Sequence, residues 1–138
     1  MKRDMDLIRK IAFALEESGP TESTDIVVDG YSDELIAYNC ELMLDAGLIV
    51  VRDAEKIHSF YLSRGTTRLS WSGHEFLDAA RNDTVWNSVT GKVKSTATTM
   101  TFDGLKSLLQ QAGQQALKHG ADWLLKTDWQ WVQYFPLS

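Results

Sequence analysis

The sequence predicts an α+β fold, in which helices surround a small antiparallel β-region and a helical extension follows. Apolar residues recur at three- and four-residue steps in several stretches. Short β-rich runs separated by turn residues lie between residues 48 and 71. With 138 residues, 43% hydrophobic and 24% charged, the chain suits one soluble domain. We expect a domain at 1–82 and an extension at 83–138 packed on the same core.

The first predicted helix covers residues 4–17. Asp4 is a natural N-cap, and Gly19 and Pro20 are typical of a helix end. The run "DIVVDG", residues 25–30, predicts a short strand that leads into a turn. The apolar face of the helix is expected to consist of Met5, Ile8, Ile11, Ala12 and Leu15.

The second predicted helix begins after Ser32, its expected N-cap. Tyr31 and Ile36 occupy the two positions of a hydrophobic staple, and Gly47 is the expected C-cap. The buried stripe is expected to be Leu35, Tyr38, Leu42 and Ala46.

A β-region is predicted directly after this helix. "LIVVR" and "IHSFYL" are expected to form two strands, and a turn around Gly65 precedes a third, short strand at "RLSW".

The stretch "RLSWSGHEFLDAAR", residues 68–81, contains an adjacent His and Glu. The zinc-protease pattern needs a second His three residues after the Glu, where this chain has Asp78. The spacing of Ser72 and Glu75 predicts a capping box, with Trp71 and Phe76 as its staple. We therefore interpret the stretch as a helix start, with His74 facing solvent.

Two more helical segments follow. "NDT" after Arg81 predicts a break, and an apolar pattern then continues at Val85, Trp86, Val89 and Val93. A last helix is expected at 102–118, with Thr101 as its cap and Met100 and Leu105 at staple spacing. Its apolar face is expected to be Phe102, Leu105, Leu108, Leu109, Ala112, Ala116 and Leu117.

The order of these elements resembles a winged-helix domain. The runs that carry the resemblance are "LDAGLIVV", a following hairpin, and "RLSWSGHEFLDAAR", which contains the pattern L-[ST]-x-x-G. More narrowly, "MKRDMDLIRKI", "GYSDELIAYNCELMLDAGLI" and "LSWSGHEFLDAARNDTVW" are similar to a domain-of-unknown-function family of small uncharacterised bacterial and prophage proteins. Where that family leads us to expect a His, the chain has Asn39, so no role of that histidine is carried over. The resemblance implies a fold and a mobile-element setting, and it supplies no activity.

Several function classes are disfavoured by the residues. His58, His74 and His119 lack metal-ligand spacing, and Cys40 lies inside a predicted helix. There is no phosphate-binding glycine loop and no nucleophile elbow. We therefore expect no enzyme activity, no catalytic residue, no metal and no cofactor. The amphipathic start is no signal peptide, and no apolar run suits a membrane span, so we expect a cytoplasmic protein without membrane contact.

Nucleic acid is a disfavoured partner. Residues 1–82 carry nine Lys and Arg against fifteen Asp and Glu, a balance of −6. The outward face of the candidate recognition helix at 33–46 would present Glu34, Ala37, Glu41 and Asp45, and the helix has no cation to offset phosphate repulsion. The alternative is a DNA-binding regulator that uses a basic wing made of Arg52, Lys56, Arg64 and Arg68.

Protein contact is the favoured reading. Five of the fourteen aromatic residues fall near the C-terminus: Trp123, Trp129, Trp131, Tyr134 and Phe135. Aromatic side chains carry much of the energy of protein interfaces; equally, these could fold back and complete the core. We expect a small non-enzymatic regulatory or accessory protein of mobile-element type. It would act through a protein partner or self-association, using these aromatics and the carboxylates of 33–46.

Overall fold

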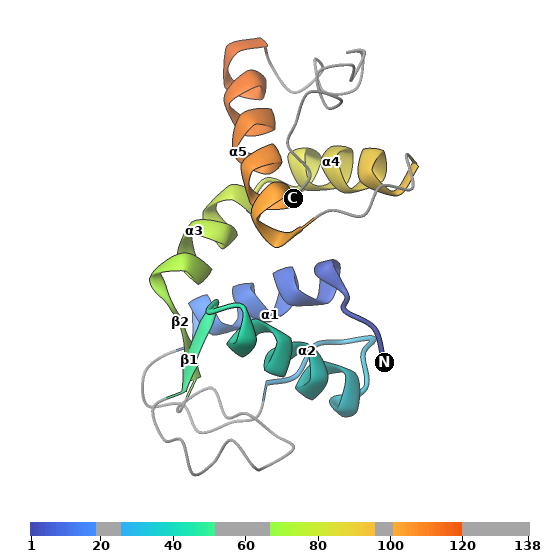
Figure 1. Cartoon of the computed structure of the whole chain (residues 1–138), viewed down its shortest axis with the longest axis vertical. Helices are drawn as coiled ribbons and strands as arrows, with labels where there is room; N and C mark the ends of the chain where they lie inside the picture. The colour runs from blue at the N-terminus through green and yellow to red at the C-terminus, as the bar shows by residue number, and fades with distance from the viewer. Residues whose placement is uncertain (19–25, 52–66, 96–100, 120–138) are drawn as a thin grey trace. The chain divides into compact units, whose positions relative to one another are not determined.

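The computed structural model describes residues 1–18, 26–51, 67–95 and 101–119. The fold of this part is mixed α+β and ends in a helix, as predicted (Figure 1). The chain divides into two compact units, Met1–Leu77 and Asp78–Ser138. The elements, in order, are α1 (Met5–Glu17), α2 (Asp33–Asp45), β1 (Ile49–Val51), β2 (Thr67–Leu69), α3 (Trp71–Ala80), α4 (Asp83–Ser95) and α5 (Phe102–His119).

Helix α1 begins where the sequence predicted. The Asp4 carboxylate accepts a hydrogen bond from the Leu7 N–H at 3.1 Å, which satisfies a backbone donor of the first turn. The helix ends at Glu17, and the hydroxyl of its C-cap Ser18 donates to the Ala14 carbonyl at 2.7 Å. Gly19 and Pro20, the predicted stop, lie outside the described residues. The buried face is Leu7, Ile8, Ile11, Ala12 and Leu15, and Met5 is only half-buried.

The predicted strand before α2 is wrong, whereas the predicted turn is confirmed. Residues 26–28 form no strand, because in the described part of the chain β1 and β2 pair only with each other. The turn closes when the Tyr31 N–H donates to the Val28 carbonyl at 3.3 Å. Gly30 has a φ of 86°, a left-handed conformation that glycine adopts without steric cost.

Both ends of α2 follow the sequence prediction. The Ser32 hydroxyl accepts from the Leu35 N–H at 3.2 Å. At the other end Gly47 has a φ of 75°, its N–H donates to the Leu44 carbonyl at 3.1 Å, and the Leu48 N–H donates to the Met43 carbonyl at 2.9 Å. This pair of bonds is the Schellman motif, which ends the helix and turns the chain into β1.

The buried face of α2 differs from the predicted stripe. Leu35, Tyr38 and Leu42 are half-buried and Ala46 is exposed. The residues that point into the core, next to α1, are Ile36, Asn39, Cys40 and Met43. The helix is therefore rotated by about one residue from the prediction, and the reason is a polar side chain that a hydropathy pattern assigns to the surface.

That side chain is Asn39, which is 0% exposed. Its Oδ1 accepts a hydrogen bond from the Asp4 backbone N–H at 2.9 Å, and its Nδ2 donates to the Leu35 carbonyl at 3.0 Å. A buried amide is stable only when its polar atoms are paired in this way. The bond from Asp4 joins the start of α1 to the middle of α2 and helps to fix which face of α2 meets α1, while the bond to Leu35 lies within α2 and pairs the other end of the amide.

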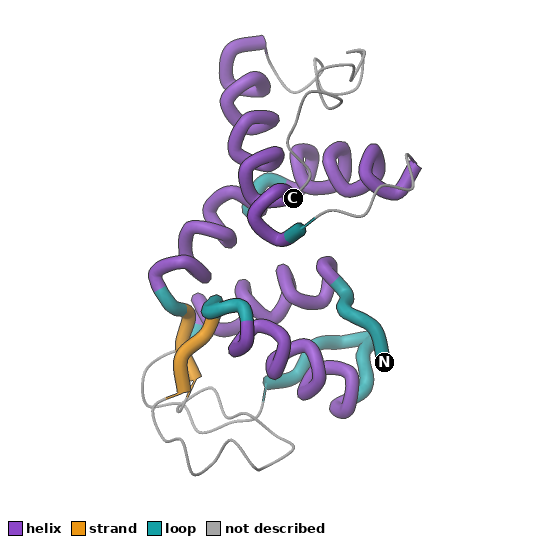
Figure 2. Tube along the Cα trace, in the orientation of Figure 1, coloured by secondary structure: helices purple, strands orange, loops and turns teal. Residues whose placement is uncertain are grey.

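The sheet consists of β1 and β2 in antiparallel register, with Ile49 opposite Leu69 and Val50 opposite Arg68 (Figure 2). Side chains alternate along a strand, so Ile49 and Leu69 are buried while Val50 and Arg68 are exposed. Thr67 is also buried. The other predicted strand, 57–62, and the turn at Gly65 lie outside the described residues.

A short connection leads from β2 to α3, and its hydrogen bonds show that the predicted capping box is wrong. The cap is Ser70, not Ser72: the Gly73 N–H donates to the Ser70 hydroxyl at 3.0 Å, and the His74 N–H donates to the Ser70 carbonyl at 3.0 Å. Ser70 is the cap, and not Ser72, because Ser70 is also hydrogen-bonded to the residues that directly follow α2. Its N–H donates to the Leu48 carbonyl at 2.9 Å, and its hydroxyl donates to the Gly47 carbonyl.

Gly73 lies against the backbone at this junction. A Cβ atom on Gly73 would overlap the Leu48 carbonyl oxygen and lie 3.1 Å from Leu69 Cδ2. Only glycine permits this approach. The pattern L-S-x-x-G therefore has a physical meaning here: the Leu fills the core, the Ser caps α3, and the Gly allows close packing.

In the second unit, α4 packs against α5. Asn82 caps α4, since its side chain accepts from the Val85 N–H at 3.0 Å. Thr101 caps α5 as predicted, accepting from the Gly104 N–H at 3.1 Å. The predicted partner of that cap, Met100, lies outside the described residues. The buried apolar residues are Ala80, Val85, Trp86, Val89, Leu105, Leu108, Leu109 and Ala112.

The predicted apolar face of α5 is wrong at its end. Leu117 is 90% exposed. Successive residues of a helix are rotated by about 100°, so Leu117 lies well away from the line through Leu105, Leu108 and Ala112. Phe102 and Ala116 are half-buried.

We expect Gly73→Ala to destabilise the first unit by about 1–3 kcal/mol, because the added methyl group must displace backbone. Urea unfolding followed by circular dichroism measures this. Gly91→Ala is the matched control. Gly91 is in α4 with nothing within 4 Å of the position a Cβ atom would take, so alanine there should raise the free energy of unfolding by roughly 0.5–1 kcal/mol. Equal unfolding midpoints for Gly73→Ala and the parent protein would contradict the packing described for this junction.

Candidate functional site

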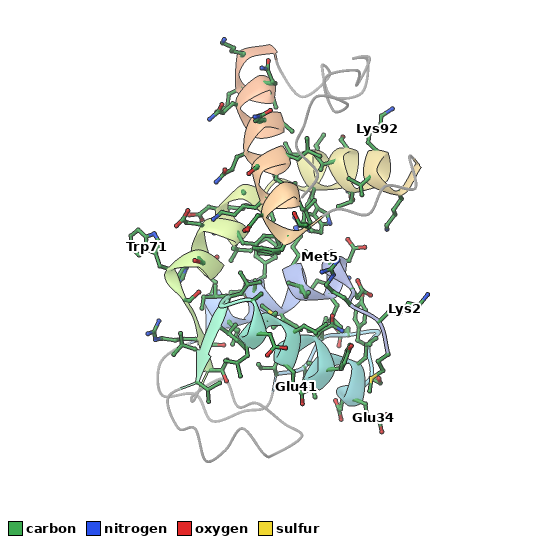
Figure 3. All side chains as sticks on the ribbon, in the orientation of Figure 1. Lys2, Met5, Glu34, Glu41, Trp71 and Lys92 are labelled. Atoms are coloured by element: carbon green, nitrogen blue, oxygen red, sulfur yellow. The ribbon has the colours of Figure 1, made fainter. Side chains whose placement is uncertain are left out.

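The first exposed surface of interest is the acidic face of α2, which consists of Glu34, Glu41 and Asp45. All three side chains are exposed, and Glu34 and Glu41 project from α2 in Figure 3. The helix places them there because Asn39 and Cys40 turn the opposite side toward the core. The predicted outward position of these three carboxylates agrees with the structure.

Charge on this face is of one sign. Residues 33–45 contain no Lys or Arg, and Asp33 and Glu34 occupy the first turn, where the helix dipole favours carboxylates. A phosphate backbone laid along this face would meet only negative side chains. The acidic face therefore has no side chain of α2 that would neutralise a phosphate.

The second surface, which we call the junction patch, consists of Val50, Arg68 and Trp71. Val50 and Arg68 are register partners on the outward face of the sheet. Trp71 is the first residue of α3 and is 81% exposed. Figure 3 shows its indole pointing away from the ribbon. Val50 and Arg68 are thus an aliphatic and a cationic neighbour on the sheet, and Trp71 follows Arg68 by three residues along the chain.

The backbone beneath Trp71 is held on both sides. Ser70, the preceding residue, is bonded to Gly47 and Leu48 at the end of α2. Gly73, two residues later, is packed on Leu48 and bonded to Ser70. Trp71 therefore projects into solvent from a backbone that is hydrogen-bonded on both sides.

Trp71 was missed as a site residue by sequence reasoning, which paired it with Phe76 in a staple inside the protein. The pairing failed because the helix is capped by Ser70, two residues before the predicted cap Ser72. The signal that could have located it is Ser70 in the L-S-x-x-G pattern, three residues before Gly73.

Most of the predicted contact residues lie outside the described residues. These are the aromatics Trp123, Trp129, Trp131, Tyr134 and Phe135 and the wing cations Arg52, Lys56 and Arg64. Of the predicted wing, Arg68 is described: it is exposed, and its guanidinium donates to the Leu69 carbonyl at 3.2 Å. The roles of the C-terminal aromatics and of the wing cations stay predictions.

Titratable groups do not converge in the part of the chain that the structure describes. No set of three His, Cys, Asp or Glu side chains in that part could hold a metal ion. His74 is exposed. Searching the same residues for a helix long and apolar enough to cross a membrane finds none.

Cys40, which the sequence places inside a helix, is fully buried. Desolvation, assisted by the nearby Glu41 carboxylate, raises the pKa of the Cys40 thiol to about 12. The thiolate is the reactive form of cysteine, so this side chain is a core residue and a poor nucleophile.

These features define a class of protein: a small mixed α+β protein whose described part offers two surfaces and no assembled catalytic cluster. A family model described as a hypothetical protein, DUF2513, matches residues 2–100, and the chain belongs to this family. A protein of Haemophilus influenzae described as an uncharacterized protein is 36% identical over 120 residues, covering 85% of this chain and 99% of that relative. No solved structure matches the chain, so the winged-helix resemblance stays a prediction.

We expect the Cys40 thiol to resist a thiol reagent such as dithionitrobenzoate in the folded protein and to react at once in denaturant. Because burial raises its pKa from 9.0 to about 12, the folded state holds the proton more tightly than the unfolded state. This contribution to stability is complete below about pH 9 and is lost as the pH rises toward 12. The rate of thiol labelling at rising urea concentration measures how well folding protects Cys40. Rapid labelling without urea would show that the thiol is accessible in the folded protein.

Proposed function

We propose that this protein is a small non-enzymatic regulatory or accessory protein that acts by contacting another protein or a second copy of itself. The observation that carries the proposal is Trp71, an 81% exposed indole on a rigid strand-to-helix junction. Tryptophan is among the residues most enriched at the energetic centres of protein interfaces.

The energetics of Trp71 support this proposal. Burying an aromatic side chain removes roughly 150–250 Å² from water, and each Å² of apolar surface contributes about 25 cal/mol. A partner that covers Trp71 would therefore gain a few kcal/mol from this one residue before the costs of association. Trp71 does not stabilise the fold by burial, so its place in the sequence fits a binding role better than a structural one.

The acidic face of α2 supports a protein partner over nucleic acid. Glu34, Glu41 and Asp45 would face phosphates if α2 entered a groove, and no Lys or Arg of α2 offsets the repulsion. The mobile-element setting rests on the resemblance alone and stays a prediction.

The second candidate function is DNA binding through the wing, and the exposed cation Arg68 is the observation that favours it. If DNA is the target, a mobility-shift assay should show binding that weakens steeply with salt. Arg64→Ala with Arg68→Ala should then abolish the shift, because phosphate contacts supply most of such affinity. A shift that this double variant leaves unchanged excludes the wing as the contact.

We expect Trp71→Ala to lose partner binding while unfolding within about 0.5 kcal/mol of the parent protein, since an exposed side chain contributes little to stability. Affinity purification from the native host, followed by quantification of each captured protein, measures the binding. Leu117→Ala is the matched control, because Leu117 is also exposed but lies on α5. Capture or self-association that Trp71→Ala and Leu117→Ala alter equally would remove the support for the proposal.

A further inference from the structure

We draw no further inference here: the strongest candidate, the exposed indole of Trp71 at the start of α3, belongs to the site already described, and nothing in the residues that the structure describes shows what covers it.

Discussion

The structure of the first unit depends on the contact between Gly73 and the Leu48 carbonyl. Around it, Ser70 donates to Gly47 and Leu48 and caps α3. One serine thereby pairs two carbonyl groups that follow α2, those of Gly47 and Leu48, and one backbone N–H of the first turn of α3, that of Gly73. All of these hydrogen-bond partners of Ser70 are backbone groups. The start of α3 is therefore held next to β1 by bonds that do not depend on side-chain packing. This constraint also places Trp71 in solvent.

A second constraint acts between α1 and α2. Asn39 is a buried amide in an otherwise apolar face, and it joins the Asp4 N–H to the Leu35 carbonyl. An unpaired amide in this position would cost about 1–3 kcal/mol, so the amide favours the helix orientation that pairs it. The orientation buries Cys40 and turns Glu34 and Glu41 outward. The chemistry of the exposed surface is thus a consequence of a hydrogen bond in the core.

The two exposed surfaces differ in what they can do. The acidic face repels phosphate at long range and gives little affinity by itself, because exposed charges are well solvated. The residues of the junction patch differ from it: they are one exposed aromatic, one aliphatic and one cationic side chain. The chain belongs to the DUF2513 family, and under the function proposed above the aromatic would supply affinity while the carboxylates would exclude the wrong partners.

Local signals in the sequence determined the helices and their caps at Asp4, Ser32 and Thr101, because a cap needs only neighbours within one turn. They also determined that α2 presents carboxylates and no cation. Prediction from the sequence was wrong where two nearby residues satisfy the same local rule. Both Ser70 and Ser72 satisfy a local capping rule, and only the bonds of Ser70 to residues 47 and 48 select between them. Hydropathy likewise misplaced the buried face of α2, because the partner of Asn39 is 35 residues away. Exposure of Trp71 follows from these long-range bonds, so tertiary structure alone decided it.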